Sequence, residues 1–252
     1  MDNNSVINQK LVNVERAASD IRRGGSVVIA GDNSALLVTS AELITDSRLK
    51  SFMDLSDGGA LIGLTYNRAN ILKISPRSGD VALVCIKDYM NSGVISSMAD
   101  PADDLIKVMQ GPFHVSDQVP MDAHDAGIKL CKIANLLPAA IYSTPLDNAD
   151  EWAAENNILI VAASDVLNHS LNDALSLNII TSASVPLAGA EAATMVAFRP
   201  EDGGTEHFAI LIGDPPRDAP VLTRIHSECF TGDLLGSLKC DCGEQMRGAI
   251  KY

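Results

Sequence analysis

Up to about residue 175, the chain switches repeatedly between two hydrophobic spacings. Over residues 7–23, apolar residues recur every three or four positions, which predicts a helix that the Gly24-Gly25 pair ends. Short runs of branched apolar residues follow, bounded by turn-forming residues, and these predict buried strands. The expected helices cover residues 7–23, 46–53, 101–109, 124–135, 148–156 and 164–175, and the expected strands cover 26–30, 35–39, 60–65, 81–87, 138–143 and 158–162. Strands that alternate with helices predict a layered α/β or α+β domain over residues 1–178.

The pattern then changes. Residues 181–190 carry neither charge nor a regular apolar spacing, which predicts a connector between two domains. Beyond it, apolar runs over 193–198, 207–213 and 221–226 are separated by polar turns rich in Gly and Pro, which predicts strands. A helix is expected to begin near Gly243. The sequence thus predicts a second, β-rich domain over residues 179–252.

Composition narrows the classes of partner. The net charge of −13 argues against a nucleic-acid polymer or an anionic membrane as partner. No apolar run approaches the ~20 residues of a membrane span, and the first residues lack the pattern of a signal peptide, so we expect a cytoplasmic protein. A phosphate-bearing substrate must find a local basic pocket, a helix N-terminus or a metal ion, because the overall charge repels it.

The cysteines point to a metal site. Three of the five lie within fourteen residues, as Cys229, Cys240 and Cys242, with Gly232 available for the turn that would return the first sulfur to the other two. Three thiolates without a fourth suit a catalytic zinc ion, which keeps one position for water. The alternative is three small buried thiols in a reducing compartment. Cys85 and Cys131 lie in apolar patterns and are predicted to be core residues.

The sequence around these cysteines resembles a known motif. Arg-Ile-His-Ser-Glu-Cys-x-Thr-Gly-Asp over 224–233, with Ser-x-Lys-Cys-Asp-Cys-Gly-x-Gln over 237–245, is similar to the zinc and substrate motif of GTP cyclohydrolase II. In riboflavin synthesis that enzyme opens the imidazole ring of GTP and releases formate and pyrophosphate. The resemblance implies one zinc ion per chain on Cys229, Cys240 and Cys242. It implies GTP as substrate, Mg²⁺ with the triphosphate, a homodimer, and nucleotide contacts from Arg224, Ile225, His226, Ser227, Glu228 and Gln245.

Several side chains of the motif have alternative roles. Glu228 suits the donors of guanine, Arg224 suits a phosphate oxygen or a ring carbonyl, and Gln245 suits either the base or a water. Arg224 and Lys239 can offset the charge of three thiolates. Asp233 and Asp241 are expected either to cap turns or to orient the metal ligands.

The family's domain continues for roughly a hundred residues beyond the stretch that corresponds to Tyr252, by resemblance. The residues that the family uses for proton transfer and phosphate attack fall in that continuation, so the resemblance assigns no catalytic acid, base or nucleophile here. We therefore expect this chain to be a fragment that is inactive by itself.

The first domain resembles 3,4-dihydroxy-2-butanone-4-phosphate synthase. The shared landmarks are Gly-Gly-Ser-Val-Val-Ile-Ala-Gly-Asp over 24–32, Gly-Pro-Phe-His-Val over 111–115 and the run over 126–141. The acidic metal-binding loop of that family is missing after Asp32, and its Arg-His-Gly segment is replaced over 55–59. Its Gly-His-Thr-Glu-Ala segment is best matched by 122–126, which places Ala123 at the metal-ligand position, and a shift of one residue would place His124 there instead.

A magnesium site needs several oxygen ligands, so the resemblance implies a scaffold without lyase activity, kept for folding, dimerisation or support of the second domain. His114 and His124 are then expected to be surface or hydrogen-bonded histidines, and an altered lyase is the alternative. For the whole chain, three functions compete. They are a GTP cyclohydrolase II, a paralogue that acts on another purine or pyrimidine, and a non-catalytic dimerising scaffold.

Overall fold

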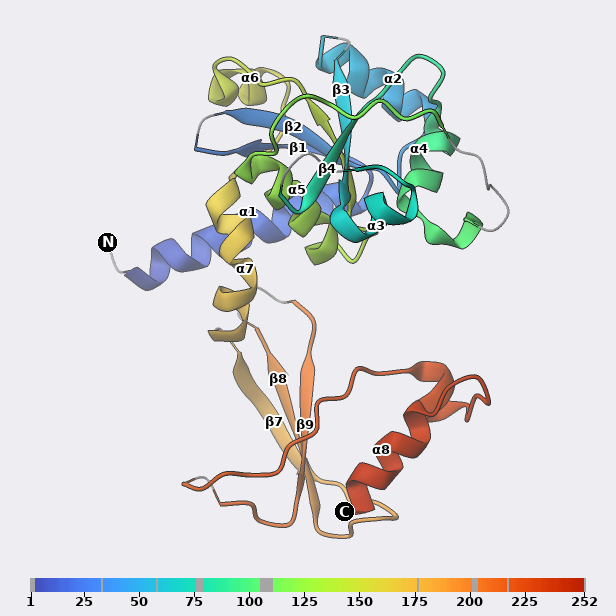
Figure 1. Ribbon diagram of the computed structural model, residues 1–252. Helices are drawn as coiled ribbons and strands as arrows, with labels where there is room; N and C mark the ends of the chain where they lie inside the picture. The colour runs from blue at the N-terminus through green and yellow to red at the C-terminus, as the bar shows by residue number, and fades with distance from the viewer. Residues whose placement is uncertain are drawn as a thin grey trace. The chain divides into compact units, whose positions relative to one another are not determined.

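The computed structural model describes residues 3–32, 34–57, 59–75, 79–104, 111–175, 177–200, 204–216 and 218–251. The chain divides into two compact units, Met1–Asp173 and Ala174–Tyr252 (Figure 1). Both units mix helices with sheets, as the predicted α+β or α/β class requires.

The first unit is built around one six-stranded sheet in the order β4-β3-β5-β2-β1-β6. Neighbouring strands are antiparallel except for β1 and β6, which are parallel. The strands are β1 (Ser26–Ala30), β2 (Ala35–Ser40), β3 (Ala60–Thr65), β4 (Val81–Cys85), β5 (Ala139–Ser143) and β6 (Ile160–Ala162). The helices are α1 (Asn3–Arg22), α2 (Asp46–Leu55), α3 (Tyr66–Ile71), α4 (Ser92–Ala99), α5 (Asp122–Ile133), α6 (Ala149–Glu155) and α7 (Ala163–Leu175), with a 3₁₀ turn η1 (Pro101–Asp103).

Both faces of this sheet are buried, so its strands are apolar at nearly every position. Alternate residues point to opposite faces, and β1 shows the consequence. Val27 and Ile29 pack into one core, whereas Val28 between them packs into the other. The first core also holds buried residues of α1 and α5, including Ile21 and Leu130. The sheet is therefore the middle layer of three.

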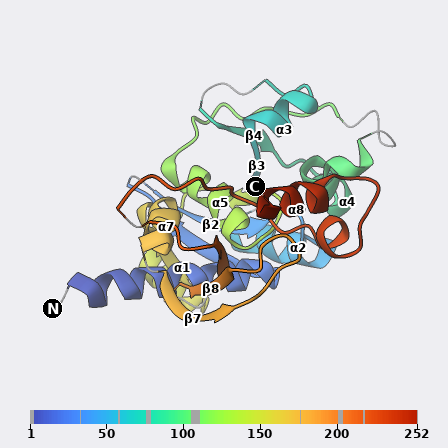
Figure 2. The same ribbon diagram turned by 90° about the horizontal axis from the view of Figure 1, so that it is seen from below.

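Helices α2 and α4 contribute to the second core and lie next to each other (Figure 1 and Figure 2). Phe52 of α2 and Met98 of α4 are both buried there. Asp46, the first residue of α2, accepts a hydrogen bond of 2.9 Å from the backbone N–H of Ser92 at the start of α4. The two helix starts are thus joined by a polar contact as well as by apolar packing.

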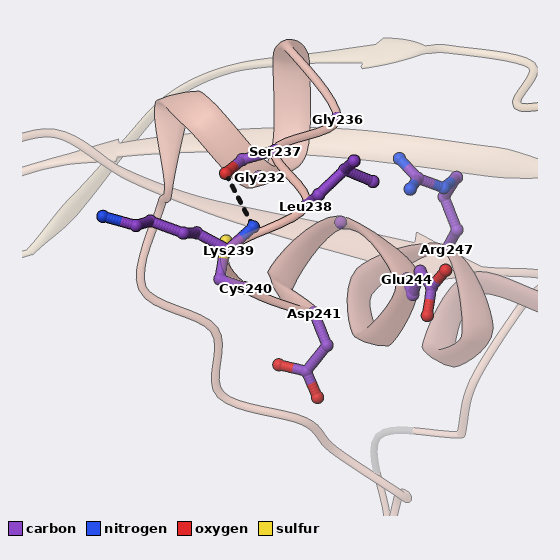
Figure 3. A pocket seen from close by; sticks show the side chains of 10 residues that line it. Gly232, Gly236, Ser237, Leu238, Lys239, Cys240, Asp241, Glu244 and Arg247 are labelled. Carbon is purple, nitrogen blue, oxygen red and sulfur yellow. Dashed lines mark hydrogen bonds between the residues drawn. The ribbon is translucent and has the colours of Figure 1, made fainter.

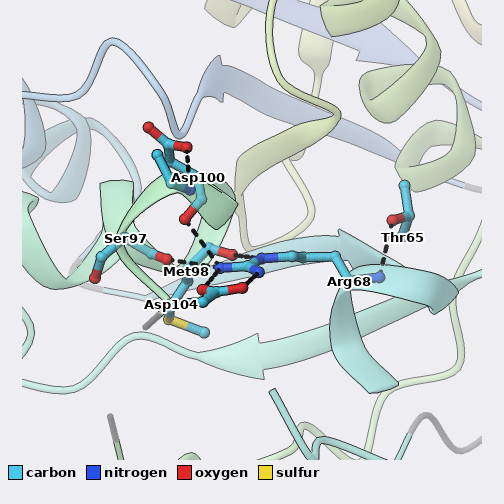
Figure 4. Close-up of polar contacts among 7 residues, drawn as sticks. Thr65, Arg68, Ser97, Met98, Asp100 and Asp104 are labelled. Carbon is cyan, nitrogen blue, oxygen red and sulfur yellow. Dashed lines mark hydrogen bonds and ion pairs between the residues drawn. The ribbon is translucent and has the colours of Figure 1, made fainter. Parts of the chain in front are cut away.

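A buried arginine ties α3 to the end of α4 (Figure 4). The Arg68 guanidinium donates to the carbonyl oxygens of Met98, Ser97 and Asp100 at 2.7, 2.9 and 3.1 Å. It also pairs with both carboxylate oxygens of Asp104, at 2.5 and 2.8 Å. The last carbonyls of a helix have no partner within the helix, so Arg68 satisfies groups that would otherwise be buried and unpaired.

The second unit carries a three-stranded antiparallel sheet in the order β7-β8-β9. Its strands are β7 (Asn178–Ser184), β8 (Ala193–Arg199) and β9 (His207–Ile212). A long loop then leads to the π-helical turn η2 (Phe230–Leu234) and to α8 (Cys242–Lys251). Among the strand residues of this unit, only Ala193 and Val196 are buried.

Most predicted elements are present, and two expectations for the second unit need correction. Residues 181–190 are not a plain connector, because the first part of this stretch belongs to β7, which pairs with β8 along its length. Every residue of β7 is exposed, so backbone pairing makes the strand without an apolar pattern to reveal it. The predicted strand 221–226 is not a strand. Its apolar residues are exposed, Ile225 at 93%, and it pairs with no strand of the described sheets.

The predicted helix 101–109 is described only at its start, where Pro101–Asp103 form a 3₁₀ turn, and residues 105–110 lie outside the described part of the chain. Helices α3 and α4 were not predicted. Each is short and begins at a side-chain cap, Thr65 for α3 and Asn91 for α4. Cys131 is fully buried, as predicted, whereas Cys85 is only partly buried at the end of β4. Across the ranges given above, no helix combines the length and the apolar character that crossing a bilayer requires.

Candidate metal centre

Three cysteine thiols converge in the second unit. The sulfur atoms of Cys229, Cys240 and Cys242 all lie within 4.8 Å of one another, and those of Cys229 and Cys240 are 3.8 Å apart. With zinc–sulfur bonds of about 2.3 Å, tetrahedral coordination separates two sulfurs by about 3.8 Å. The spacing of this trio therefore fits a zinc ion. In the described part of the chain, these are the residues grouped closely enough to hold a metal ion.

Gly232 makes this convergence possible. A Cβ atom at this position would lie 2.8 Å from the Cys240 sulfur, 2.9 Å from Cys242 Cβ and 3.3 Å from the Cys229 sulfur. Gly243 also permits this close packing, because a Cβ atom at its position would lie 2.3 Å from the carbonyl oxygen of Gly232. The π-helical turn can thus lie against the first turn of α8 only because both positions lack a side chain.

The thiols differ in how readily they ionise. The pKa of Cys229 is lowered, first by a hydrogen bond from the Gly232 backbone and then by bonds from Thr231 and the two neighbouring thiols. The pKa of Cys242 is raised to about 11, first by its hydrogen bonds with Cys229 and then with Cys240. The Cys229 thiol therefore ionises first, and its negative charge opposes ionisation of the Cys242 thiol. Three adjacent thiolates need a cation, which is what a metal ion provides.

Asp233 joins the thiol site to the predicted nucleotide motif. Its Oδ2 atom accepts a hydrogen bond of 2.8 Å from the backbone N–H of Cys229 and lies 3.0 Å from Nε2 of His226. These two contacts, His226 first, lower the pKa of the Asp233 carboxyl. The Oδ1 atom is buried and has no partner among the described residues. Asp233 thus orients a cysteine backbone and a histidine at once.

Asp241 makes a second link of this kind. It lies between the two cysteines of the Cys-x-Cys pair, and its Oδ2 atom accepts a hydrogen bond of 2.7 Å from the Gln245 side-chain amide. The carbonyl oxygen of that amide accepts a hydrogen bond of 2.5 Å from Arg224. The structure therefore brings Arg224 and Gln245 together beside the cysteines, although 21 positions separate them in sequence.

A hollow of about 480 Å³ opens beside the Cys240 thiol (Figure 3). Two cationic side chains, Lys239 and Arg247, stand on different sides of it, and Ser237 lies at its edge. The Ser237 hydroxyl accepts a hydrogen bond of 3.2 Å from the Lys239 backbone. The other lining residues are Gly232, Gly236, Leu238, Cys240, Asp241, Gly243 and Glu244. Lys239 and Arg247 bring positive charge to this hollow, and Asp241 and Glu244 bring negative charge to the same lining.

The remaining residues of the predicted nucleotide motif are not gathered in the same way. Ile225, Ser227 and Glu228 are exposed on the loop before the first cysteine. Arg247 was missed in the sequence. The sequence feature that could have indicated Arg247 is its position on the helix that begins at Cys242, five positions after that cysteine. In the structure, its guanidinium lies close to Gly243.

In the first unit, the residues at the position of the synthase metal site are used for packing. His124 is fully buried, and its Nδ1 atom accepts a hydrogen bond of 3.0 Å from the Met121 backbone. Burial lowers the pKa of His124 to about 4. The Asp122 carboxylate accepts from the backbone N–H groups of Asp32 and Ala123 at 3.0 and 2.9 Å. His114 is exposed, as expected from the sequence, whereas Nε2 of His124 is buried and has no hydrogen-bond partner among the described residues.

Comparison with known proteins agrees with both halves of this description. Residues 178–252 match the family model for GTP cyclohydrolase II. A GTP cyclohydrolase-2 of Azospirillum brasilense is 37% identical over 241 residues, covering 94% of this chain and 63% of the relative. A GTP cyclohydrolase-2 of Xylella fastidiosa (strain 9a5c) is 30% identical over 244 residues, covering 95% of this chain and 58% of the relative. A riboflavin biosynthesis protein RibBA of Phocaeicola vulgatus is 26% identical, over 96% of this chain and 69% of the relative.

Solved structures show the fold of the first domain. A cation-free 3,4-dihydroxy-2-butanone 4-phosphate synthase has a TM-score of 0.50 and 16% identity, over 63% of this chain and 96% of that protein. RibBX, a two domain 3,4-dihydroxy-2-butanone 4-phosphate synthase from A. baumannii, also has a TM-score of 0.50 and 16% identity, over 92% of this chain and 79% of that protein. At this identity the likeness concerns the fold alone.

The fold and the site together define a protein with a synthase-like layered domain followed by a unit that carries a three-cysteine site. Residues 178–252 match the GTP cyclohydrolase II family, and two GTP cyclohydrolase-2 proteins align with 94% and 95% of the chain, which agrees with the resemblance seen in residues 224–245. The chain spans between 58% and 69% of the length of the three curated relatives named above.

Proposed function

We propose that the protein takes part in zinc-dependent opening of the guanine imidazole ring of GTP, with release of formate and pyrophosphate. The observation that carries this proposal is the convergence of three cysteine sulfurs within 4.8 Å around a glycine that leaves room for them. A zinc ion bound there would supply an acidified water in a site with three protein ligands.

The side chains near the thiols suit the substrate. Arg224, Lys239 and Arg247 offer positive charge to the triphosphate, which also carries Mg²⁺. His226, held by Asp233, and Gln245, held by Asp241, offer fixed polar groups at the edge of the thiol site. Ile225, Ser227 and Glu228 lie on the exposed loop before Cys229, where they can close over the base when it binds.

Zinc analysis and a formate assay test this proposal. We expect one zinc ion per chain and binding of GTP by the zinc-loaded chain, both lost in Cys240→Ser. Cys131→Ser is a matched control, because Cys131 is buried in the other unit at the α5–β5 contact. The formate assay uses a longer protein that includes the residues found in the relatives beyond the aligned region. If that protein binds zinc but neither binds GTP nor releases formate, a paralogue that acts on another purine or pyrimidine is favoured. Function retained in Cys240→Ser would favour a scaffold.

The synthase-like domain is proposed to lack lyase activity and to support folding and a homodimer of a cytoplasmic enzyme. The support for this proposal is that Asp122 is engaged by backbone N–H groups and His124 is buried with its Nδ1 occupied. Nε2 of His124 has no hydrogen-bond partner among the described residues, but it is buried, and the sequence lacks the acidic loop that would supply further oxygen ligands to a magnesium ion. We expect no formation of 3,4-dihydroxy-2-butanone 4-phosphate by the protein, and measurable formation with added Mg²⁺ would overturn this part of the proposal.

A further inference from the structure

Two of the three converging thiols lie close enough to react with each other. The sulfur atoms of Cys229 and Cys240 are 3.8 Å apart, although the residues are eleven positions apart in sequence. A disulfide holds its sulfurs about 2.05 Å apart, so closure needs an approach of roughly 1.8 Å. Gly232 lies beside both sulfurs, where a Cβ atom would be 3.3 Å from one and 2.8 Å from the other. Because Gly232 has no side chain, nothing at this position opposes the approach.

The loop that joins the two cysteines can follow this movement. Gly236 lies in it with a φ of 65°, and nothing lies within 4 Å of its Cβ position. The apolar side chains on either side of that glycine, Leu234, Leu235 and Leu238, are all exposed. The second half of the loop therefore has few packing contacts to lose when the sulfurs draw together.

The third cysteine is less suited to a disulfide. Only one residue separates Cys240 from Cys242, so a bond between them closes a small ring that strains the preferred dihedral angle of about 90°. Cys242 is also the first residue of α8. Its Cβ atom would lie 2.9 Å from a Cβ atom at Gly232, so it packs closely against the π-helical turn. The geometry thus favours the pair Cys229 and Cys240.

An oxidant in solution can reach this pair. Cys240 is exposed and lines the hollow of about 480 Å³, and Cys229 is partly buried (Figure 3). The Thr231 hydroxyl oxygen lies 3.6 Å from the Cys229 sulfur, so a protonated group stands beside the reacting atoms. Cysteines that sense oxidants are solvent-accessible and lie next to a second cysteine that resolves the first oxidation product. Cys131, by contrast, is fully buried in the first unit.

We infer that Cys229 and Cys240 form a site of reversible oxidation by hydroperoxides, at which a disulfide between them replaces the bound zinc ion. The release of zinc rests on the proposed function, whereas formation of the disulfide does not. Loss of two sulfur donors leaves Cys242 as the one cysteine ligand, and zinc sites in proteins use three or four ligands. Oxidation would therefore switch off the zinc-dependent chemistry, and a thiol would restore it.

The chemical balance needs only the peroxide. The Cys240 thiolate attacks one oxygen of hydrogen peroxide, the O–O bond breaks, and the hydroxide that leaves takes a proton to become water. Cys240 is then a sulfenic acid. The Cys229 sulfur attacks the Cys240 sulfur, so an S–S bond forms, the S–O bond breaks, and a second hydroxide leaves and takes a proton. Counted from the thiol forms, the cysteines lose two electrons and two protons, which the peroxide accepts. Dithiothreitol reverses the change by thiol–disulfide exchange.

Titration of the zinc-loaded full chain with hydrogen peroxide tests this inference. We expect the release of one zinc ion for each disulfide formed, followed with a coloured zinc indicator, and a mass lower by two hydrogen atoms. Trypsin cuts after Lys239, so a bond between Cys229 and Cys240 joins two peptides, whereas a bond between Cys240 and Cys242 lies within one. Dithiothreitol with added zinc should restore the starting mass and zinc content. Oxidation that yields only sulfinic or sulfonic acids would overturn the inference, as would a bond confined to Cys240 and Cys242.

Variants identify the reacting pair. Cys242→Ser retains both reacting sulfurs and should still give the joined peptides, whereas Cys229→Ser and Cys240→Ser should not. Cys85→Ser removes a partly buried cysteine of the first unit and should behave like the wild type. An equal yield of joined peptides from Cys240→Ser would show that Cys229 reacts with Cys242 instead, which contradicts the assignment.

The outcomes separate this inference from the proposed function. A wild type that holds zinc and binds GTP but forms no joined peptides overturns the inference and leaves the proposed function standing. A wild type that holds no zinc and still forms the disulfide overturns the proposed function together with the release of zinc, while the oxidation site stands.

Discussion

Gly232 lies so close to Cys240 that a methyl group on its Cα would sit 2.8 Å from the cysteine sulfur. Two further atoms of the cysteine trio would lie within 3.3 Å of the same methyl. We therefore expect Gly232→Ala to push the sulfurs apart and to lower zinc affinity by at least tenfold, as measured by competition with a chelator. Gly248→Ala is the spatial control, since nothing lies within 4 Å of its Cβ position and its backbone does not have a positive φ. Equal zinc affinity in wild type and Gly232→Ala would show that the turn can open without losing the ion.

A second prediction concerns Asp233, which orients the backbone of Cys229. Asp233→Asn keeps the shape of the side chain but removes its negative charge, which weakens the contact with His226. The new amide can also place its N–H₂ group against the Cys229 N–H, where two donors face each other. Loss of partners that orient metal ligands typically lowers metal affinity about 10- to 100-fold. We expect a fall in zinc affinity within that range. Glu206→Gln is the control for removal of a carboxylate charge in the same unit, and it should leave zinc affinity unchanged.

A third prediction concerns the buried guanidinium of Arg68. Arg68→Ala leaves three backbone carbonyls and the Asp104 carboxylate without their donor. Leaving buried backbone carbonyls without this donor costs about 1–3 kcal/mol in the free energy of unfolding. Urea denaturation measures this loss. Asp104→Asn should cost less, because the three carbonyl contacts of Arg68 remain, and a larger loss for Asp104→Asn than for Arg68→Ala would contradict this account.

The fourth prediction is a dependence of stability on pH. Burial lowers the pKa of His124 to about 4, against 6.5 for the ordinary side chain. Between these values the unfolded chain binds a proton that the folded chain does not, so stability falls as the pH is lowered from about 6.5 to about 4. The contribution is at most about 3 kcal/mol. His124→Gln, which does not titrate, should flatten this part of the curve of unfolding free energy against pH. A curve of unchanged slope would show that another group is responsible.

The apolar pattern predicted most helices and strands of the first domain. It failed for elements that depend on backbone pairing between strands or on side-chain caps of short helices. Val27, Val28 and Ile29 are apolar in succession because both faces of their strand are buried, and this pattern is legible in the sequence. Strand β7 has no such pattern because all of its residues are exposed. The run 221–226 has the pattern of a strand but pairs with no strand of the described sheets. Strand formation in these two places depends on neighbours that a local pattern does not reveal.

The clustering of the three cysteines could be predicted from the sequence, whereas the contacts that support the cluster could not. The spacing of Cys229, Cys240 and Cys242 was sufficient to place three sulfurs together. The partners of Asp233 and Asp241 depend on the path of the loop, so the sequence left capping and orientation as equal alternatives. The structure shows that each carboxylate reaches a residue of the motif, His226 in one case and Gln245 in the other.

Helix α8 begins at Cys242, so one residue is both the start of the helix and a sulfur donor of the trio. In the proposed zinc-bound form, removal of the ion would release the residue at which the helix begins. We therefore expect addition of a chelator to cause a partial, reversible loss of the helical signal in far-ultraviolet circular dichroism. This loss should precede any unfolding of the larger domain.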